Sequence, residues 1–283
     1  MQTEFEIARR TVLVGALGLP ALPAKAQAEM VRFATEGAFR PWNWTEPDGT
    51  LAGFEIELYK DLCRRANLTC TIQAQSFDGA IPALQAGKYD AIISGMSATP
   101  KREGVILFTI PYGSTGQSFA AEKGTPLARL PDKGKVFSLD TEEPAAIAEI
   151  GTLKPLLQGK IVGAQTASIA ASFLDNYLKG VVEVREYKTT DEHDLDLASG
   201  RVDLVMASMA YLTTAASKPG NEDMAITGPR FQGGVLGRGS SIGLRKDEGA
   251  LKVKLDKAIT EAKNDGTIRA LSLKYFGYDV TVR

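Results

Sequence analysis

The chain has 283 residues, a formal net charge of -1, 44% hydrophobic residues and 24% charged residues. This length is enough for one large domain or for two domains of ordinary size, each with a substantial core. The composition excludes a largely disordered chain, and the near-neutral charge argues against a nucleic-acid partner.

The first 28 residues have the pattern of a signal peptide. A short charged stretch ends in Arg9-Arg10, an apolar run follows over residues 11–22, and the sequence Ala26-Gln27-Ala28 suits a cleavage site. The apolar run is interrupted by Pro20 and is shorter than the about 20 residues that a membrane-spanning helix needs. We expect export and cleavage after Ala28, and the paired arginines leave both the general secretory and the twin-arginine routes open.

Two cysteines, Cys63 and Cys70, lie seven residues apart. In an oxidising compartment they are candidates for a disulfide, which over so short a loop adds roughly 2 to 3 kcal/mol. Two buried thiols are the alternative. A metal site is not expected, because the chain's single histidine, His193, is far away in sequence, and we place it on a solvated helix within residues 191–194.

Apolar strand patterns alternate with amphipathic helix patterns along the mature chain, which predicts an α/β fold. The predicted strands cover residues 31–35, 70–75 and 90–94. The predicted helices cover residues 54–66, 79–85 with Asp78 as the cap, 250–263, and a short segment that follows Asp265-Gly266 and ends at Phe276.

A weak internal repeat relates residues 86–97 to residues 199–210, and each copy combines a helix end, a turn, a buried strand and a polar loop. Chance similarity is the alternative for so short a match. Ligands of open α/β sheets bind at the carboxyl ends of the strands, so two such units that face each other would line a cleft from both sides.

Small and polar residues at 113–117 and 228–234 separate apolar strand patterns, and we interpret them as two crossings between lobes. Two crossings imply a discontinuous first lobe, residues 29–116 with 233–283, and a continuous second lobe, residues 117–232. Crossings of this kind allow two lobes to close on a ligand.

Several stretches, in the right order along nearly the whole mature chain, resemble the periplasmic polar-amino-acid-binding proteins of ABC importers. They are residues 34–41, 53–58, 77–82, 90–102, 243–246, and 265–267 with 274–276. The likeness is greatest to the lysine, arginine, ornithine and histidine branch, and within it to octopine- and nopaline-binding proteins. The resemblance implies the type II two-lobed fold, a disulfide between Cys63 and Cys70, and delivery of a small ligand to a membrane permease. No cofactor is expected, because the sequence contains no phosphate-loop or dinucleotide-binding motif. We expect a monomer.

The resemblance also assigns site residues in the first lobe. Arg102 corresponds to the arginine that clamps the ligand's α-carboxylate, for which a planar guanidinium is well suited, although a surface arginine near a helix start is the alternative. The loop before it contributes Ser94, Gly95, Met96 and Ser97, whose hydroxyl and backbone N–H groups suit an anion.

Glu36 corresponds to the acidic residue that binds the ligand's distal cation, with a solvated carboxylate as its alternative role. Phe39 and Phe77 occupy positions where the family packs rings against the ligand's aliphatic stem. The alternative is that both are ordinary aromatic residues of the core. From the second lobe, the resemblance implies ligand contacts from Gln165, Thr166, Ala167 and Ser168, in a loop that departs from the family's Gly-Ser-Thr pattern.

The main departure is Ser208, where binders of free amino acids carry an aspartate that pairs with the α-ammonium. Burying an ammonium without a counter-charge is costly. We therefore expect an opine or similar conjugate, whose nitrogen is substituted, with free basic amino acids as the alternative. An enzyme similar to cyclohexadienyl dehydratases, with Glu36 as its acid or base, is a further alternative, but no nucleophile and base pattern supports it.

Overall fold

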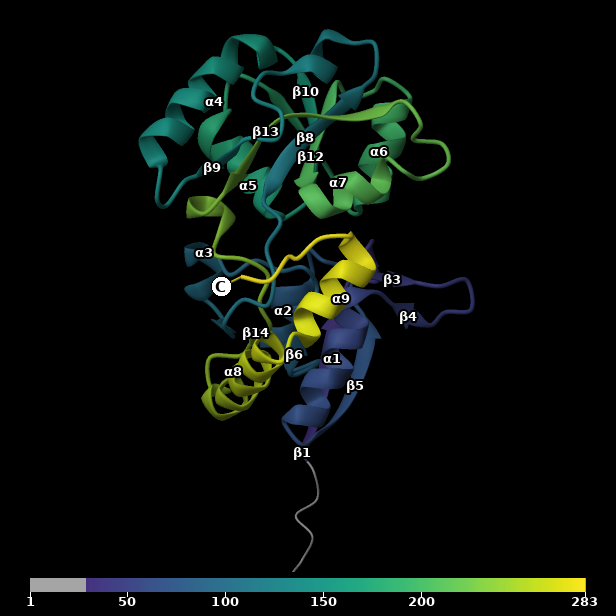
Figure 1. Ribbon diagram of the computed structural model, residues 1–283, viewed down its shortest axis with the longest axis vertical. Coiled ribbons are helices and arrows are strands. Elements are labelled where there is room, and N and C mark those ends of the chain that lie inside the picture. The colour runs from purple at the N-terminus through teal and green to yellow at the C-terminus, as the bar shows by residue number, and fades with distance from the viewer. Residues whose placement is uncertain (1–28, 283) are drawn as a thin grey trace, which may run out of the picture.

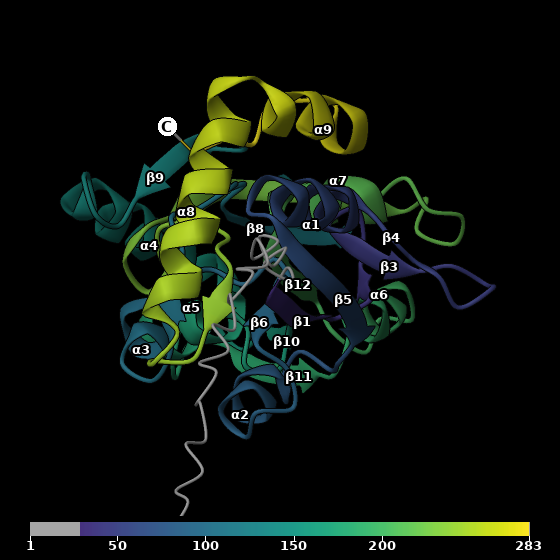
Figure 2. The same ribbon diagram turned by 90° about the horizontal axis from the view of Figure 1, so that it is seen from below.

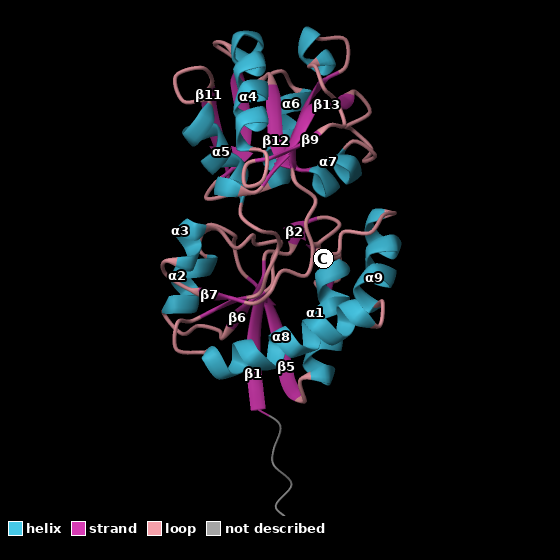
Figure 3. Cartoon of the chain, turned by 60° about the vertical axis from the view of Figure 1, so that its left-hand side comes forward, coloured by secondary structure: helices cyan, strands magenta, loops and turns pink. Residues whose placement is uncertain are grey.

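The computed structural model describes residues 29–282, so the predicted signal peptide lies outside the described residues. The chain forms two lobes, one around each of two mixed β-sheets, joined by loop segments (Figures 1 and 3). The predicted α/β class and the two-lobed architecture are confirmed.

The first lobe is built on a five-stranded sheet in the order β5-β1-β6-β14-β7. Strands β5, β1 and β6 are parallel, whereas β14 pairs antiparallel with β6 and β7. The bounds are β1 (Glu29–Thr35), β5 (Leu68–Ala74), β6 (Ala91–Ile92), β7 (Leu107–Phe108) and β14 (Gly243–Leu244). A small antiparallel sheet lies beside it, formed by β2 (Ala38–Phe39), β3 (Asn43–Thr45) and β4 (Leu51–Ala52).

Helices cover both faces of the first sheet because side chains along its strands alternate between the two faces. In β1, Val31 and Phe33 belong to the core that also contains residues of three helices, whereas Ala34 belongs to the smaller core on the other face. The three helices are α1 (Phe54–Arg65), α8 (Gly249–Asn264) and α9 (Thr267–Phe276), which lie together on one side of the sheet (Figure 2). On the other side are α2 (Ala80–Gln85) and α3 (Pro100–Glu103).

The predicted elements of this lobe occur with small shifts of their ends. The exception is the cap of α2, which is Gly79, whereas the predicted cap residue, Asp78, only accepts a hydrogen bond from the Gly79 amide. Strand β6 is completely buried, as expected for a strand in the middle of a sheet with helices on both faces.

The second lobe is built on a six-stranded sheet in the order β11-β10-β12-β8-β13-β9. Its strands are β8 (Gln117–Glu122), β9 (Val136–Ser138), β10 (Ile161–Gln165), β11 (Glu183–Tyr187), β12 (Leu204–Ser208) and β13 (Met224–Gln232). Its helices are the 3-10 helix η1 (Pro126–Arg129), α4 (Glu143–Leu157), α5 (Ile169–Tyr177), α6 (Thr190–Ala198) and α7 (Met209–Ala215). Alternation in β12 again divides the core, since Leu204 and Met206 face α4 and α5 while Val205 and Ala207 face α6 and α7.

The chain leaves the first lobe just before β8 and returns after β13, through the 3-10 helix η2 (Gly234–Leu236). The segment predicted as the second crossing, residues 228–234, overlaps the last five residues of β13, so this prediction began too early. The C-terminal segment accompanies the first crossing, because Ser114 N donates to Val280 O at 2.8 Å.

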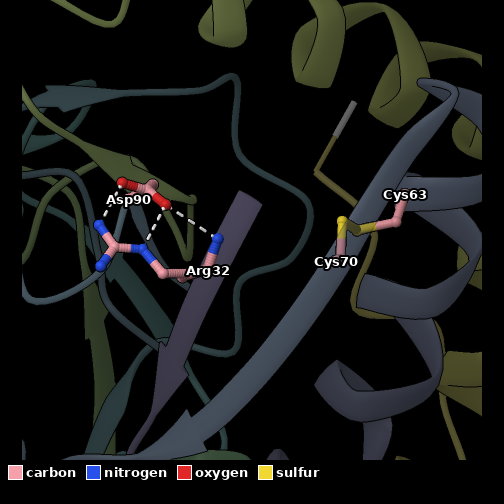
Figure 4. Close-up of a disulfide and its surroundings, with 4 residues drawn as sticks. All are labelled: Arg32, Cys63, Cys70 and Asp90. Carbon is pink, nitrogen blue, oxygen red and sulfur yellow. Dashed lines mark hydrogen bonds and ion pairs between the residues drawn. A yellow bond between two sulfur atoms is a disulfide. The ribbon is translucent and has the colours of Figure 1, made fainter. Parts of the chain in front are cut away.

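The predicted disulfide between Cys63 and Cys70 is confirmed, and it joins the last turn of α1 to β5 (Figure 4). The same figure shows Arg32 of β1 paired with Asp90, with Arg32 Nη2 at 2.9 Å from Asp90 Oδ1. The Arg32 hydrogen bonds, followed by those of Arg245, lower the pKa of Asp90 to about 2. Both contacts tie a strand of the first sheet to a neighbouring segment of the same lobe.

His193 is not on a solvated surface, contrary to our prediction. It lies on α6 with no exposed surface, and its neighbour Asp194 is also buried. The buried positions of α6 are residues 190, 193, 194 and 197, which is the spacing of one helix face. The many acidic residues next to His193 in the sequence suggested an exposed helix, although the spacing of the buried residues is that of one helix face.

Candidate ligand-binding cleft

A cavity with an empty volume of about 740 Å³ lies between the two lobes. The first lobe contributes five of the predicted residues to its lining, namely Phe39, Phe77, Gly95, Ser97 and Arg102. The second lobe contributes three, namely Gln165, Ser168 and Ser208. The cavity therefore collects residues that are more than 100 positions apart in the sequence, at the ends of strands from both sheets.

The carboxyl ends of two central strands supply much of this lining. Gly95 and Ser97 follow β6, and Ser208 ends β12, so the two copies of the internal repeat face each other across the cavity. Gly95 has a φ of 56°, and a Cβ placed there would lie 2.9 Å from Cε1 of Phe39. A glycine at this position therefore allows the Phe39 ring to approach the backbone closely.

Arg102 is the only charged residue that lines the cavity, within the part of the chain that the structure describes. Its Nη1 donates to Ser97 O at 2.9 Å, and its Nη2 donates to Ala167 O of the second lobe, also at 2.9 Å. The guanidinium lies 5.5 Å from the centre of the Phe77 ring. Burial lowers the pKa of Arg102 to about 10, so the side chain is still a cation at neutral pH.

Ser97 and the amide of Gly95 have partners within the protein. Ser97 Oγ donates to Leu236 O at 2.7 Å and accepts from Gly239 N at 3.3 Å, which connects it to the second crossing. The Gly95 amide donates to Glu55 Oε1 at 2.6 Å. Glu55 has no exposed surface, and burial raises its pKa, whereas the Gly95, Asn43 and Tyr112 donors act in the opposite direction.

Glu36 lies behind the cavity lining and reaches toward the second lobe. Its Oε1 accepts from Gln165 Nε2 at 2.5 Å, while its Oε2 is buried and has no hydrogen-bond partner. Burial raises the pKa of Glu36 to about 8, and the negative charges of Glu55, Asp191 and Asp78 add to this effect against the Gln165 hydrogen bond. The surroundings of Glu36 therefore disfavour its carboxylate form, and a cation placed beside it would stabilise that form.

The remaining predicted residues support the site from behind. Ser94 Oγ accepts from the Glu36 amide at 2.8 Å, and Met96 is buried in the core beside α2. The Thr166 amide donates to Tyr187 O at 2.8 Å, which holds the loop between β10 and α5. Ala167 follows it with a φ of 60° and presents its carbonyl to Arg102.

Two of the lining residues in the second lobe are helix caps. Ser168 Oγ accepts from Ala171 N at 3.1 Å at the start of α5, and Ser208 Oγ accepts from Tyr211 N at 3.2 Å at the start of α7. Both residues line the cavity, and a serine hydroxyl that accepts one hydrogen bond keeps a second lone pair for a further donor. The Ser208 position contains no carboxylate, and no aspartate or glutamate from the described residues lines the cavity.

Sequence reasoning missed lining residues near the crossings and at the base of the cavity. They include Trp42, Ser114, Gln117, Thr190 and Ser240. Trp42 follows Phe39 by only three residues in the sequence, and the first crossing was already recognised at residues 113–117, so both signals were available. Thr190 could not be found, because its place depends on how α6 packs against the first lobe.

Comparison with known proteins decides the family. The model of "Bacterial extracellular solute-binding proteins, family 3" matches residues 31–278. The chain belongs to this family.

Within residues 29–282, none of the helices of this solute-binding protein has the length and apolarity needed to cross a membrane. In the same part of the chain, no three metal-ligating side chains lie close enough together to hold a metal ion.

The curated relatives are binding proteins. The octopine-binding periplasmic protein of Rhizobium meliloti is 43% identical, over 96% of this chain and 98% of that protein. The L-arginine-binding protein of Pseudomonas aeruginosa is 31% identical, over 96% and 98%. A solved periplasmic His/Glu/Gln/Arg/opine family-binding protein of Silicibacter pomeroyi, in complex with lysine, is 34% identical with a TM-score of 0.72, over 89% of this chain and 100% of that one. The predicted family and its solute-binding role are confirmed.

Proposed function

We propose that this solute-binding protein binds an opine or a similar amino-acid conjugate in the periplasm and delivers it to the permease of an ABC importer. The observation that carries the proposal is the charge of the cavity lining, which contains Arg102 and no carboxylate among the described residues. A free α-ammonium would be buried there without a counter-charge, which is costly.

The roles of the site residues follow from this arrangement. Arg102 clamps a carboxylate of the ligand in place of the Ala167 carbonyl, and Phe39 and Phe77 cover the aliphatic stem. Ser208 offers a neutral hydroxyl where the ligand nitrogen carries its substituent. Glu36 pairs with the distal cation after Gln165 gives way.

The comparisons support the same ligand class, since the relative at 43% identity is named as an octopine-binding protein. They also support a second candidate, the free basic amino acids, because relatives at 31% identity are named for arginine and for lysine, arginine and ornithine. The predicted signal peptide and the periplasmic relatives support export. An enzymatic role has less support, because the named relatives are binding proteins and a structure described as a precursor of cyclohexadienyl dehydratase, at 22% identity, shares the fold alone.

The test is a calorimetric titration of the purified protein with octopine, nopaline, mannityl opines, arginine and lysine. We expect one of the opines to bind more tightly than either free amino acid. Tighter binding of free arginine than of every opine would reject the proposed ligand class and favour the second candidate. Turnover of prephenate or arogenate would reject a purely binding role.

A further inference from the structure

Among the contacts that cross from the first lobe to the second, three around the cavity differ in whether a ligand must break them. Glu36 accepts from Gln165, and Arg102 donates to Ala167 O, so both contacts occupy groups that a ligand would need. The third is a stack between the rings of Phe39 and Tyr211, with centroids 5.4 Å apart and planes 10° from parallel. Because Phe39 lines the cavity and Tyr211 does not, a ligand can enter without breaking this stack.

Tyr211 is fixed within the second lobe by polar groups at the far end of its ring. Its hydroxyl donates to Asp194 Oδ2 at 2.6 Å and lies 3.2 Å from Asp191 Oδ1. Lys218 Nζ lies 2.5 Å from the same Asp191 oxygen and 5.4 Å from the centre of the Tyr211 ring. The ring has no exposed surface, and burial followed by the charges of Asp194 and Asp191 raises the pKa of Tyr211, so it stays a hydrogen-bond donor.

A buried histidine supports this tyrosine from the side. The His193 ring meets Tyr211 edge-on at 5.9 Å and Tyr187 edge-on at 6.2 Å. His193 Nδ1 lies 3.1 Å from Asp194 Oδ1, so the carboxylate that accepts from Tyr211 also faces the imidazole. Aromatic pairs with this edge-to-face geometry restrict each other's orientation.

We propose that Tyr211 is a positioning residue for ligand binding, which stacks on Phe39 as the lobes close and holds that ring as a wall of the cavity. The stack favours the closed state before a ligand has replaced the Glu36 and Arg102 contacts, and it persists after the ligand is bound. This inference rests on the proposed binding function but not on the identity of the ligand. Offset aromatic pairs of this kind shift an equilibrium by about two- to tenfold.

The experiment is a double-mutant cycle with Tyr211→Ala, Phe39→Ala and the double variant. The dissociation constant for octopine and for arginine is measured by calorimetry, and the radius of gyration without ligand is measured by small-angle X-ray scattering. Tyr211→Ala should weaken binding by about two- to tenfold and increase the ligand-free radius of gyration. Once Phe39 is alanine, Tyr211→Ala should have little further effect, because the partner ring is already absent.

Tyr211→Phe separates the ring from its hydroxyl. It keeps the stack but removes the shorter of the two hydrogen bonds to Asp194 Oδ2 and leaves only the one from Asn221 Nδ2 at 3.5 Å, so it should lower the thermal midpoint while the ligand-free radius of gyration stays unchanged. Tyr211→Leu keeps apolar volume without a flat ring. If the alanine variant does not fold, the leucine variant should show the increase in ligand-free radius of gyration expected for alanine.

Independent, additive effects of the Phe39 and Tyr211 substitutions would overturn the proposal. A lower thermal midpoint in Tyr211→Ala with an unchanged radius of gyration and unchanged binding would also overturn it, because Tyr211 would then only support the second lobe. The scattering measurement needs no ligand, so it tests the stack even if no opine binds. Failure of the proposed ligand class would appear only in the titrations.

Discussion

Gln165 Nε2 lies 2.5 Å from Glu36 Oε1, so the Gln165 amide of the second lobe donates a hydrogen bond to the Glu36 carboxyl group of the first. The second oxygen of Glu36 is buried without a partner. Under the proposed function, the Gln165 amide therefore takes the place of the ligand's distal cation beside Glu36. A ligand with a guanidinium or ammonium group must compete with Gln165 for the Glu36 carboxyl group. A ligand without such a group gains no ion pair by displacing Gln165.

Binding of a cationic ligand should depend on pH through Glu36. Burial raises the pKa of this carboxyl to about 8 in the ligand-free protein, so it is largely protonated at pH 6 and 7. Pairing with a cation requires the carboxylate, so binding releases a proton and the affinity should rise with pH by up to about tenfold per unit until about pH 8. Calorimetry at pH 6, 7 and 8, in buffers with different ionisation enthalpies, measures both effects.

Glu36→Gln should remove this pH dependence, whereas Glu186→Gln, at a position exposed to solvent on β11, should leave it intact. If affinity for arginine and octopine is flat between pH 6 and 8 in the unmodified protein, Glu36 does not bind the distal cation.

Arg102→Ala should weaken binding by at least about 30-fold, because a ligand carboxylate would be buried without its partner. Arg102→Lys should recover only part of the loss, since an ammonium cannot form the two parallel bonds of a guanidinium. Quenching or enhancement of tryptophan fluorescence on titration gives the measurement, because Trp42 lines the cavity. Lys101→Ala, at the exposed neighbouring position, is the matched control, and an equal loss there would show that the effect is not specific to the clamp.

Ser208→Asp should shift selectivity toward free arginine by about tenfold or more relative to octopine, since it supplies a counter-charge for an α-ammonium. The cap of α7 should survive, because aspartate is as good an N-cap as serine. Ser208→Asn has nearly the same shape without the charge and serves as the control. Competition titrations with both ligands provide the ratio, and a ratio that moves equally in both variants would contradict the assignment of this position.

Replacing both Cys63 and Cys70 by serine should lower the free energy of unfolding by roughly 2 to 3 kcal/mol, the value for a short closed loop. Ligand affinity should stay within about twofold, since neither cysteine lines the cavity. Thermal melting with and without reductant, followed by titration, checks both parts. A large loss of affinity at unchanged stability would mean that the disulfide affects the cleft.

The lobe 1 elements and much of the cleft could be predicted, because their signals are local. The patterns around Arg102, and the aromatic pair Phe39 and Phe77, lie in short motifs that follow buried strands. Tyr211 carried no such signal, since a tyrosine in the first turn of a helix is ordinary and only the tertiary structure places it against Phe39. His193 was misjudged because charge density dominated over the helical spacing of its buried neighbours.

The disulfide has a practical consequence for measuring lobe motion. Both cysteines of the sequence are joined to each other, so the oxidised protein presents no thiol to a labelling reagent. Lys60 on α1 and Lys154 on α4 are exposed, one on each lobe. Cysteines introduced at these two positions would be the only reactive thiols, so no native cysteine would need to be replaced first. A pair of dyes attached there would report opening and closing of the lobes in single molecules.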